Sequence, residues 1–115
     1  MPNITKAQIR FSDKEIEEII EIAGYGIGYW AYAAQWDTDK KIYKVSWRDS
    51  DDEPFAYKFL SYNDIREAID RITLHQVEVG DNTLEALISA DMGAIDADAA
   101  DSIIQIAALG EIVYG

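Results

Sequence analysis

Carboxylates are the side chains with which this sequence could do the most chemistry. The chain of 115 residues holds 22 Asp and Glu against 10 Lys and Arg, a formal net charge of −12. Carboxylates can serve as an acid–base pair, as ligands of a hard cation, or as an anionic surface for a basic partner. Each use requires different neighbours, so the spacing of the acids indicates which use applies.

Catalysis finds little support in the residue types. The chain has no cysteine, and its one histidine, His75, falls at the end of a predicted helix, where a structural role is the more common one. A glycosidase-type pair needs two carboxylates in one cleft with separated pKa values, and with 22 acids close pairs arise by chance. We therefore expect a protein that is not an enzyme and that uses no cofactor.

The densest acidic run is the one candidate for a cation-binding loop. An EF-hand loop that starts at Asp49 needs glycine at its sixth position and glutamate at its twelfth, where this chain has Pro54 and Leu60. The EF-hand motif therefore fails, and we expect no metal site. The run itself remains as a compact acidic cluster, formed by Asp49, Asp51, Asp52 and Glu53.

Glycines at alternate positions raise the question of a nucleotide site. Gly24, Gly26 and Gly28 follow a predicted helix and precede a predicted strand, the reverse of a dinucleotide fingerprint, and no lysine is near. We expect these glycines to end the helix and to turn the chain into Trp30.

The C-terminal part of the chain has an extreme charge. Residues 72–115 contain eight acids and no Lys or Arg. Helical neighbours three apart, such as Asp98 and Asp101, lie about 5–6 Å from each other, which approaches the spacing of nucleic acid phosphates. We expect these carboxylates and the acidic run to form an anionic, partner-binding surface made of Asp49, Asp51, Asp52, Glu53, Asp91, Asp96, Asp98 and Asp101.

The same charge limits the partners. A net charge of −12 opposes the binding of nucleic acid phosphates and of anionic lipids, so we expect neither direct nucleic acid binding nor membrane binding. The competing interpretation is that the charge only keeps the protein soluble. The lack of cysteine and of an apolar leader in residues 1–6 favours the cytoplasm as the compartment.

The N-terminal elements must position these residues. Alternating apolar residues predict an edge strand from Thr5 to Phe11. Ser12 and Glu15 then form a capping box for a helix that starts at Asp13 and ends near Gly24.

Three runs with a period of two follow and predict a three-stranded antiparallel meander. We expect one aromatic face, covered by helices, that holds Trp30, Tyr32, Trp36, Tyr43, Val45, Trp47, Phe55, Tyr57 and Phe59. The opposite face is expected to be wetted and holds Ala31, Ala33, Gln35, Lys44, Ser46, Arg48 and Lys58. RNA-binding sheets also expose aromatics, but they combine them with basic grooves, so packing in the core is the expected use here.

Three further helices complete the pattern. Ser61 begins one with a second capping box, and Asn82 is expected to cap a short one that Gly93 ends. Asp96 caps the last, which runs to Leu109 with Gly110 as the residue after it. The order β-α-β-β-β-α-α-α predicts an α+β fold, with residues 1–115 as one domain.

Two segments resemble a known group of proteins. Residues 26–30 read GIGYW and residues 95–115 read IDADAADSIIQIAALGEIVYG, together about a quarter of the chain. They look like segments of a group of small acidic uncharacterised proteins of phages and mobile elements, which brings no active-site residues to carry over. The resemblance implies a phage or mobile-element origin. Small acidic phage proteins often inhibit host defences, CRISPR and restriction nucleases included, sometimes as DNA mimics, so by analogy it also favours that role.

We therefore expect one of two functions, and the preferred one is given first. The first is a non-enzymatic inhibitor of the anti-CRISPR or anti-restriction type that occupies the basic DNA or RNA site of a host protein as a DNA mimic. The alternative is an assembly module in which residues 24–30 and the apolar C-terminal end form a homodimer contact, the charge serving solubility only.

Overall fold

A computed structural model describes residues 11–48 and 55–114. These residues form a helix, three strands, two helices, a short 3-10 helix and a final helix: α2 (Asp13–Ala23), β1 (Ala31–Asp37), β2 (Ile42–Arg48), β3 (Phe55–Ser61), α3 (Tyr62–Thr73), α4 (Asp81–Ser89), η1 (Met92–Ala94) and α5 (Ala97–Leu109). The predicted α+β class is confirmed. The predicted strand from Thr5 to Phe11 lies, except for Phe11, outside the described residues, and Phe11 itself is buried just before α2.

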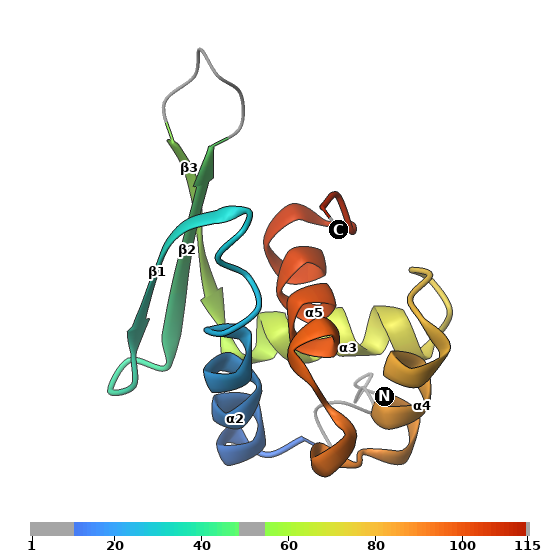
Figure 1. The fold of residues 1–115 in the computed structure, drawn as a ribbon. Helices are drawn as coiled ribbons and strands as arrows, with labels where there is room; N and C mark the ends of the chain where they lie inside the picture. The colour runs from blue at the N-terminus through green and yellow to red at the C-terminus, as the bar shows by residue number, and fades with distance from the viewer. Residues whose placement is uncertain (1–10, 49–54, 115) are drawn as a thin grey trace, which may run out of the picture.

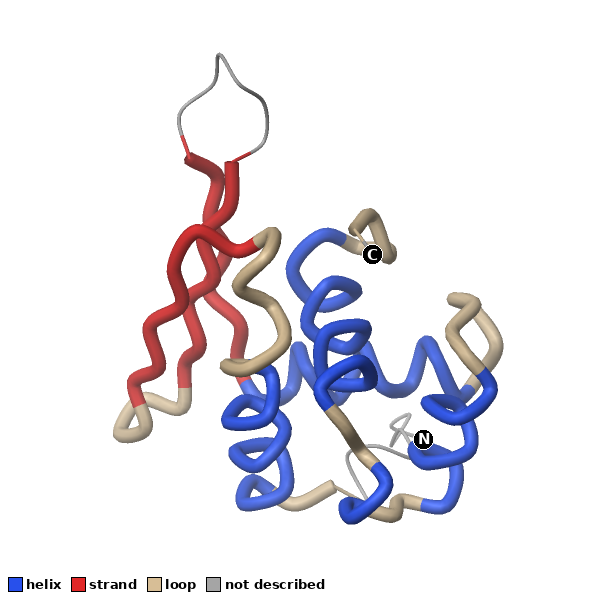
Figure 2. Tube along the Cα trace, in the orientation of Figure 1, coloured by secondary structure: helices blue, strands red, loops and turns tan. Residues whose placement is uncertain are grey.

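The three strands form the predicted meander, in the order β1-β2-β3 and antiparallel throughout. All the helices lie on one side of this sheet (Figures 1 and 2). Helix α5 lies between the sheet and α4, and it contacts α2, α3 and β3. One face of the sheet thus packs against helices, whereas over the other, which we call the open face, the described part of the chain places no helix.

The register of the strands decides which residues reach the helices. Tyr43 and Val45 of β2 are buried on the helix side, and Leu60 of β3, opposite Tyr43, is fully buried beside them. Because side chains alternate along a strand, Lys44 and Ser46 point to the open face. The ring centroids of Trp30 and Trp47 lie 6.5 Å apart.

The prediction of one aromatic face is wrong for β3. Phe59 lies opposite Lys44 and Tyr57 opposite Ser46, so both rings are on the open face, 54% and 60% exposed. A shift of one residue in the register of a strand turns every side chain to the other face. In β3 the residue on the core side is therefore Leu60, and its neighbour Phe59 points to the open face. Lys58, expected on the wetted face, lies on the helix side and donates to the Ala107 carbonyl oxygen of α5 at 3.1 Å.

The first strand also departs from strict alternation. Its pairing with β2 shifts between Ala31 and Ala33, which marks a bulge. Tyr32 sits at this bulge and is 68% exposed, so its predicted place in the core is wrong as well.

Local capping signals explain where most helices begin. Ser12 with Glu15 and Ser61 with Asp64 form complete capping boxes at α2 and α3, as predicted. Asp96 caps α5 by accepting from the Ala99 amide at 2.9 Å. For α4 the prediction of an Asn82 cap is wrong, since the helix starts after Gly80 without a side-chain cap and Asn82 is its second residue.

Candidate functional site

Half of the eight predicted partner-binding residues lie in the described part of the chain. Asp49, Asp51, Asp52 and Glu53 lie outside the described residues. The remaining four acids, Asp91, Asp96, Asp98 and Asp101, lie between the end of α4 and the first half of α5.

Asp91 and Asp96 lie together beside a shallow hollow. The hollow has a volume of about 320 Å³ and is also lined by Glu85 of α4. Asp91 accepts from the Gly93 amide at 3.1 Å and Asp96 caps α5, so helix starts fix both carboxylates on the surface. Sequence reasoning missed Glu85, although its helical spacing from Asp81 puts both on one side of α4. We call Asp81, Glu85, Asp91 and Asp96 the acidic face.

Local cations do not neutralise the acidic face. Residues 72–114 contain no Lys or Arg, and the ion pairs of Asp13 with Lys41 and with Arg66 involve none of these four acids. The four carboxylates are exposed to solvent. The acidic face is therefore a set of exposed carboxylates in a segment without basic residues.

Asp101 belongs to a different environment. Its carboxylate accepts from the Tyr29 hydroxyl at 2.6 Å, from the Trp30 indole at 2.7 Å and from the Gln105 amide at 3.0 Å. Burial and the neighbouring Asp101 raise the pKa of Tyr29 to about 12. Asp98 is exposed on the first turn of α5, and its charge adds to the rise in the Tyr29 pKa. The bonds of Asp101 are thus made within the chain, which suits a structural role.

Gln105 ties the C-terminal end to the same network. Its side chain is 1% exposed, its oxygen accepts from the Val113 and Tyr114 amides at 2.9 Å each, and its nitrogen donates to the Tyr114 carbonyl at 3.0 Å. The Tyr114 ring stacks on Trp30 with centroids 5.6 Å apart. The two segments named for the homodimer contact therefore pack against each other within one chain.

The glycines after α2 act partly as expected. The helix ends at Ala23 with Gly24 as its cap residue. At Gly26 the start of α5 approaches so closely that a Cβ atom would lie 2.9 Å from the Ala97 carbonyl oxygen, whereas at Gly28 it would meet nothing within 4 Å. Glycine is therefore required at position 26 by close packing, which single-sequence reasoning did not foresee.

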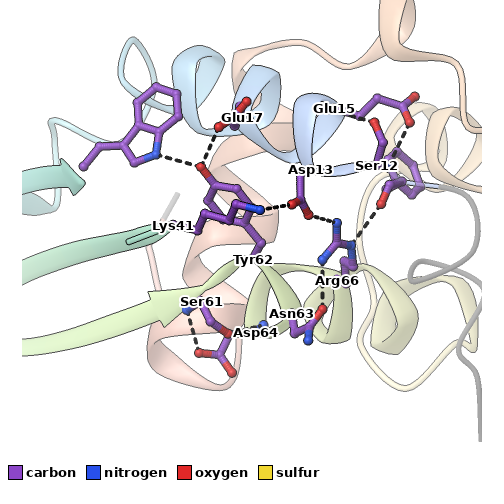
Figure 3. Close-up of polar contacts among 12 residues, drawn as sticks. Ser12, Asp13, Glu15, Glu17, Lys41, Ser61, Tyr62, Asn63, Asp64 and Arg66 are labelled. Atoms are coloured by element: carbon purple, nitrogen blue, oxygen red, sulfur yellow. Dashed lines mark hydrogen bonds and ion pairs between the residues drawn. The ribbon is translucent and has the colours of Figure 1, made fainter. Parts of the chain in front are cut away.

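A second polar cluster, which the sequence did not indicate, joins α2, α3 and the turn before β2 (Figure 3). Asp13 binds Lys41 at 2.7 Å and Arg66 at 2.5 Å, and these hydrogen bonds, that of Lys41 first, lower the pKa of Asp13. Arg66 also donates to the Phe11 carbonyl at 2.9 Å. Tyr62 donates to Glu17 at 2.8 Å and accepts from Trp36 at 3.2 Å. Each of these bonds joins two different elements or segments, so the cluster connects α2, α3, β1 and the turn before β2.

His75, the one histidine of the chain, lies on the surface. His75 is exposed, follows the end of α3 and donates its amide to the Ile72 carbonyl. Within residues 11–48 and 55–114 no three His, Asp or Glu side chains gather as a metal would need. Over the same residues no helix has the length and apolarity to cross a bilayer.

Comparison with protein-family models, curated proteins and solved structures gives no match for this chain. The functional argument therefore depends on the geometry described above.

Proposed function

We propose that this chain is a non-enzymatic binding protein of phage or mobile-element type. Its acidic face docks on the basic nucleic-acid-binding surface of a host protein and keeps nucleic acid out. The observation that supports the proposal is the charge separation. Three exposed carboxylates, those of Glu85, Asp91 and Asp96, line the hollow, and Asp81 lies one helical turn before Glu85 on α4, in a stretch of 43 residues without Lys or Arg. Such a surface produces a negative potential that steers basic partners and weakens with salt.

The proposed surface is smaller than the sequence suggested. Asp101 is not part of it, because its carboxylate is committed to Tyr29, Trp30 and Gln105. Asp98 is exposed on the first turn of α5 but is not one of the four residues of the acidic face, and Asp81 and Glu85 of α4 are added. The acidic run at residues 49–53 stays a prediction, as does the homodimer alternative, which light scattering would test.

The test uses a variant that removes charge and keeps the caps. Asp81→Asn, Glu85→Gln, Asp91→Asn and Asp96→Asn together remove four charges, and Asn caps a helix about as well as Asp. A matched control removes four surface acids elsewhere, with Glu18→Gln, Glu21→Gln, Asp39→Asn and Glu67→Gln.

Both variants and the parent chain are tested against a CRISPR effector complex and a restriction endonuclease in a DNA-binding competition assay. We expect the parent to displace DNA at about 50 mM salt and to lose this ability at about 500 mM. The acidic-face variant should lose at least about tenfold in inhibition while the control changes little. Equal losses in the two variants, salt-insensitive inhibition, or no inhibition of either target would contradict the proposal.

A further inference from the structure

The open face of the sheet carries a group of side chains that the acidic face does not use. Tyr57 and Phe59 of β3 lie there with Lys44 and Ser46 of β2 and Gln35 of β1. In register, Gln35, Lys44 and Phe59 form one row across the sheet, and Ser46 and Tyr57 form the next row. We call these five residues the aromatic–lysine face.

The two rings of Tyr57 and Phe59 are exposed on the open face. Tyr57 is 60% and Phe59 54% exposed, with ring centroids 5.6 Å apart and the planes at 82°. Large exposed aromatic rings on the uncovered side of a sheet expose apolar area without a benefit to folding. Their placement therefore indicates contact with a ligand that has flat, apolar surfaces.

The cation between the rings indicates the charge of that ligand. The Lys44 ammonium lies 4.8 Å from the centroid of Tyr57 and 5.5 Å from that of Phe59. The ring faces attract the ammonium through cation–π contacts. An anion close to the sheet would form a stronger, charge-assisted contact with the same ammonium. A ligand with both a flat ring and a negative charge would satisfy the two features together.

A hollow beside Phe59 gives the ligand a place to enter. It has a volume of about 460 Å³, and its lining includes Gln35, Lys40, Ile42, Lys44, Phe59 and one acid, Asp37. The Asp37 carboxylate accepts from the Lys40 amide at 3.0 Å, which orients the turn that carries Lys40. The hollow thus combines two lysines, an amide and an apolar floor, the mixture that nucleotide-sized ligands require.

Charge is distributed unevenly between the two sides of the molecule. Beside the open face, Lys40 and Lys44 line the hollow together with one acid, Asp37, whereas residues 72–114 hold eight acids and no Lys or Arg. The expectation that nucleic acid is excluded relied on the total charge and on buried aromatics. The second premise fails for Tyr57 and Phe59.

We propose that the aromatic–lysine face binds single-stranded nucleic acid, with one base stacked on each of Tyr57 and Phe59 and with backbone phosphates at Lys44 and Lys40. Gln35 and Ser46 provide hydrogen-bonding groups for base edges in the same rows. Only unpaired bases can stack on side chains in this way, so a duplex is not the ligand. The proposal does not depend on the function of the acidic face, which lies on the helical side.

The experiment measures binding of fluorescent 12-nucleotide oligo(dT) and oligo(U) by anisotropy at about 20 and 150 mM salt. We expect binding of the parent chain that weakens with salt, and no comparable binding of a 12-base-pair duplex. The combined variant Tyr57→Ala, Phe59→Ala should lose at least about tenfold in affinity, in line with the loss of two stacked bases. Tyr25→Ala, which removes a tyrosine that is 88% exposed outside the sheet, should have no effect.

A second pair of variants separates charge from shape. Lys44→Gln should weaken binding and reduce the salt slope by about 0.7, the value for one phosphate contact on a single strand, while Lys14→Gln on α2 should not. Tyr57→Leu with Phe59→Leu keeps apolar bulk and should still lose affinity, which distinguishes stacking from misfolding.

Several outcomes would overturn the proposal. These are no oligonucleotide binding at about 20 mM salt, equal binding of duplex and single strand, or equal losses in the Tyr25 and ring variants. Self-association of the parent without oligonucleotide, abolished by the ring variants in light scattering, would assign the face to a second copy of the chain instead. The four-residue acidic-face variant should retain oligonucleotide binding, so failure of one proposal is distinguishable from failure of the other.

Discussion

The role of Asp101 in the structure differs from the role that the sequence suggested. In the sequence it is one of several surface acids, whereas in the fold it accepts three hydrogen bonds from groups on two segments more than 70 residues apart. It holds the Trp30 indole, on which Tyr114 stacks, and it accepts from Gln105, whose side chain binds the Tyr114 backbone.

The first prediction at the residue scale concerns this network. Asp101→Asn leaves one acceptor oxygen where Tyr29 and Trp30 each donate, so we expect a loss of about 1–3 kcal/mol in the free energy of unfolding. Asp98→Asn, three residues earlier and exposed, should stay within about 0.5 kcal/mol of the parent. Urea denaturation measures both, and similar small changes in the two variants would show that the network adds nothing to stability.

The second residue-scale prediction is a loss of stability at alkaline pH. Burial raises the pKa of Tyr43 to about 12, from an ordinary value of 10.0. Folding therefore favours the neutral phenol, and this contribution is complete below pH 10 and is lost as the pH rises through about 12. Urea midpoints from pH 9 to 12 should fall less steeply for Tyr43→Phe than for the parent. The exposed Tyr25→Phe is the control, and parallel curves for all three proteins would contradict the assignment.

At the scale of elements, the fold depends on a few close approaches between them. The loop after α2 passes against the start of α5 at Gly26, and the cluster around Asp13 joins α2 to α3 and to the β1–β2 turn (Figure 3). The first contact fixes the start of α5 against the loop that leads into β1, and the second fixes α2 and α3 against the turn between β1 and β2.

The prediction at this scale compares substitutions at two glycines of one loop. Gly26→Ala would place a Cβ atom 2.9 Å from the Ala97 carbonyl oxygen, and because backbone cannot yield cheaply we expect a loss of about 1–3 kcal/mol. Gly28→Ala meets open space and should be neutral or stabilising by up to about 1 kcal/mol. Thermal and urea unfolding measure the difference, and equal effects would mean that the loop is free to move away from α5.

At the scale of the whole molecule, charge and aromatic surface occupy different sides. The helical side carries the acidic face, and the uncovered side of the sheet carries exposed rings with lysines. The two proposed functions therefore use separate surfaces that interact only through the long-range field.

That separation predicts that the effect of the acidic face on oligonucleotide binding depends on the salt concentration. Neutralising the acidic face should strengthen oligo(dT) binding at about 10 mM salt, where the Debye length is about 30 Å, because four repelling charges are removed. At about 150 mM salt, with a Debye length of about 8 Å, the variant and the parent should bind equally. Anisotropy titrations measure both. A strengthening that persists at the higher salt would mean that the acids lie close to the nucleic acid site.

Much of the secondary structure could be predicted because its signals are local. Capping boxes at Ser12 and Ser61, the Asp96 cap and the left-handed Gly110 after α5 involve residues within four positions of each other. The meander likewise follows from period-two runs and short turns. The absence of Lys and Arg from residues 72–115 is a property of the sequence itself and needs no coordinates.

Tertiary structure alone decided where the chemistry lies. Alternation along β3 allows either of two faces, and only the pairing of Leu60 with Tyr43 chooses the one that exposes Tyr57 and Phe59. In the same way, no local rule connects Asp101 to Trp30 or brings Glu85 beside Asp96. Register and contacts between distant segments are set by the packing of the whole core, so the sequence alone determined the elements and the net charge, and the folded chain determined which faces those elements present.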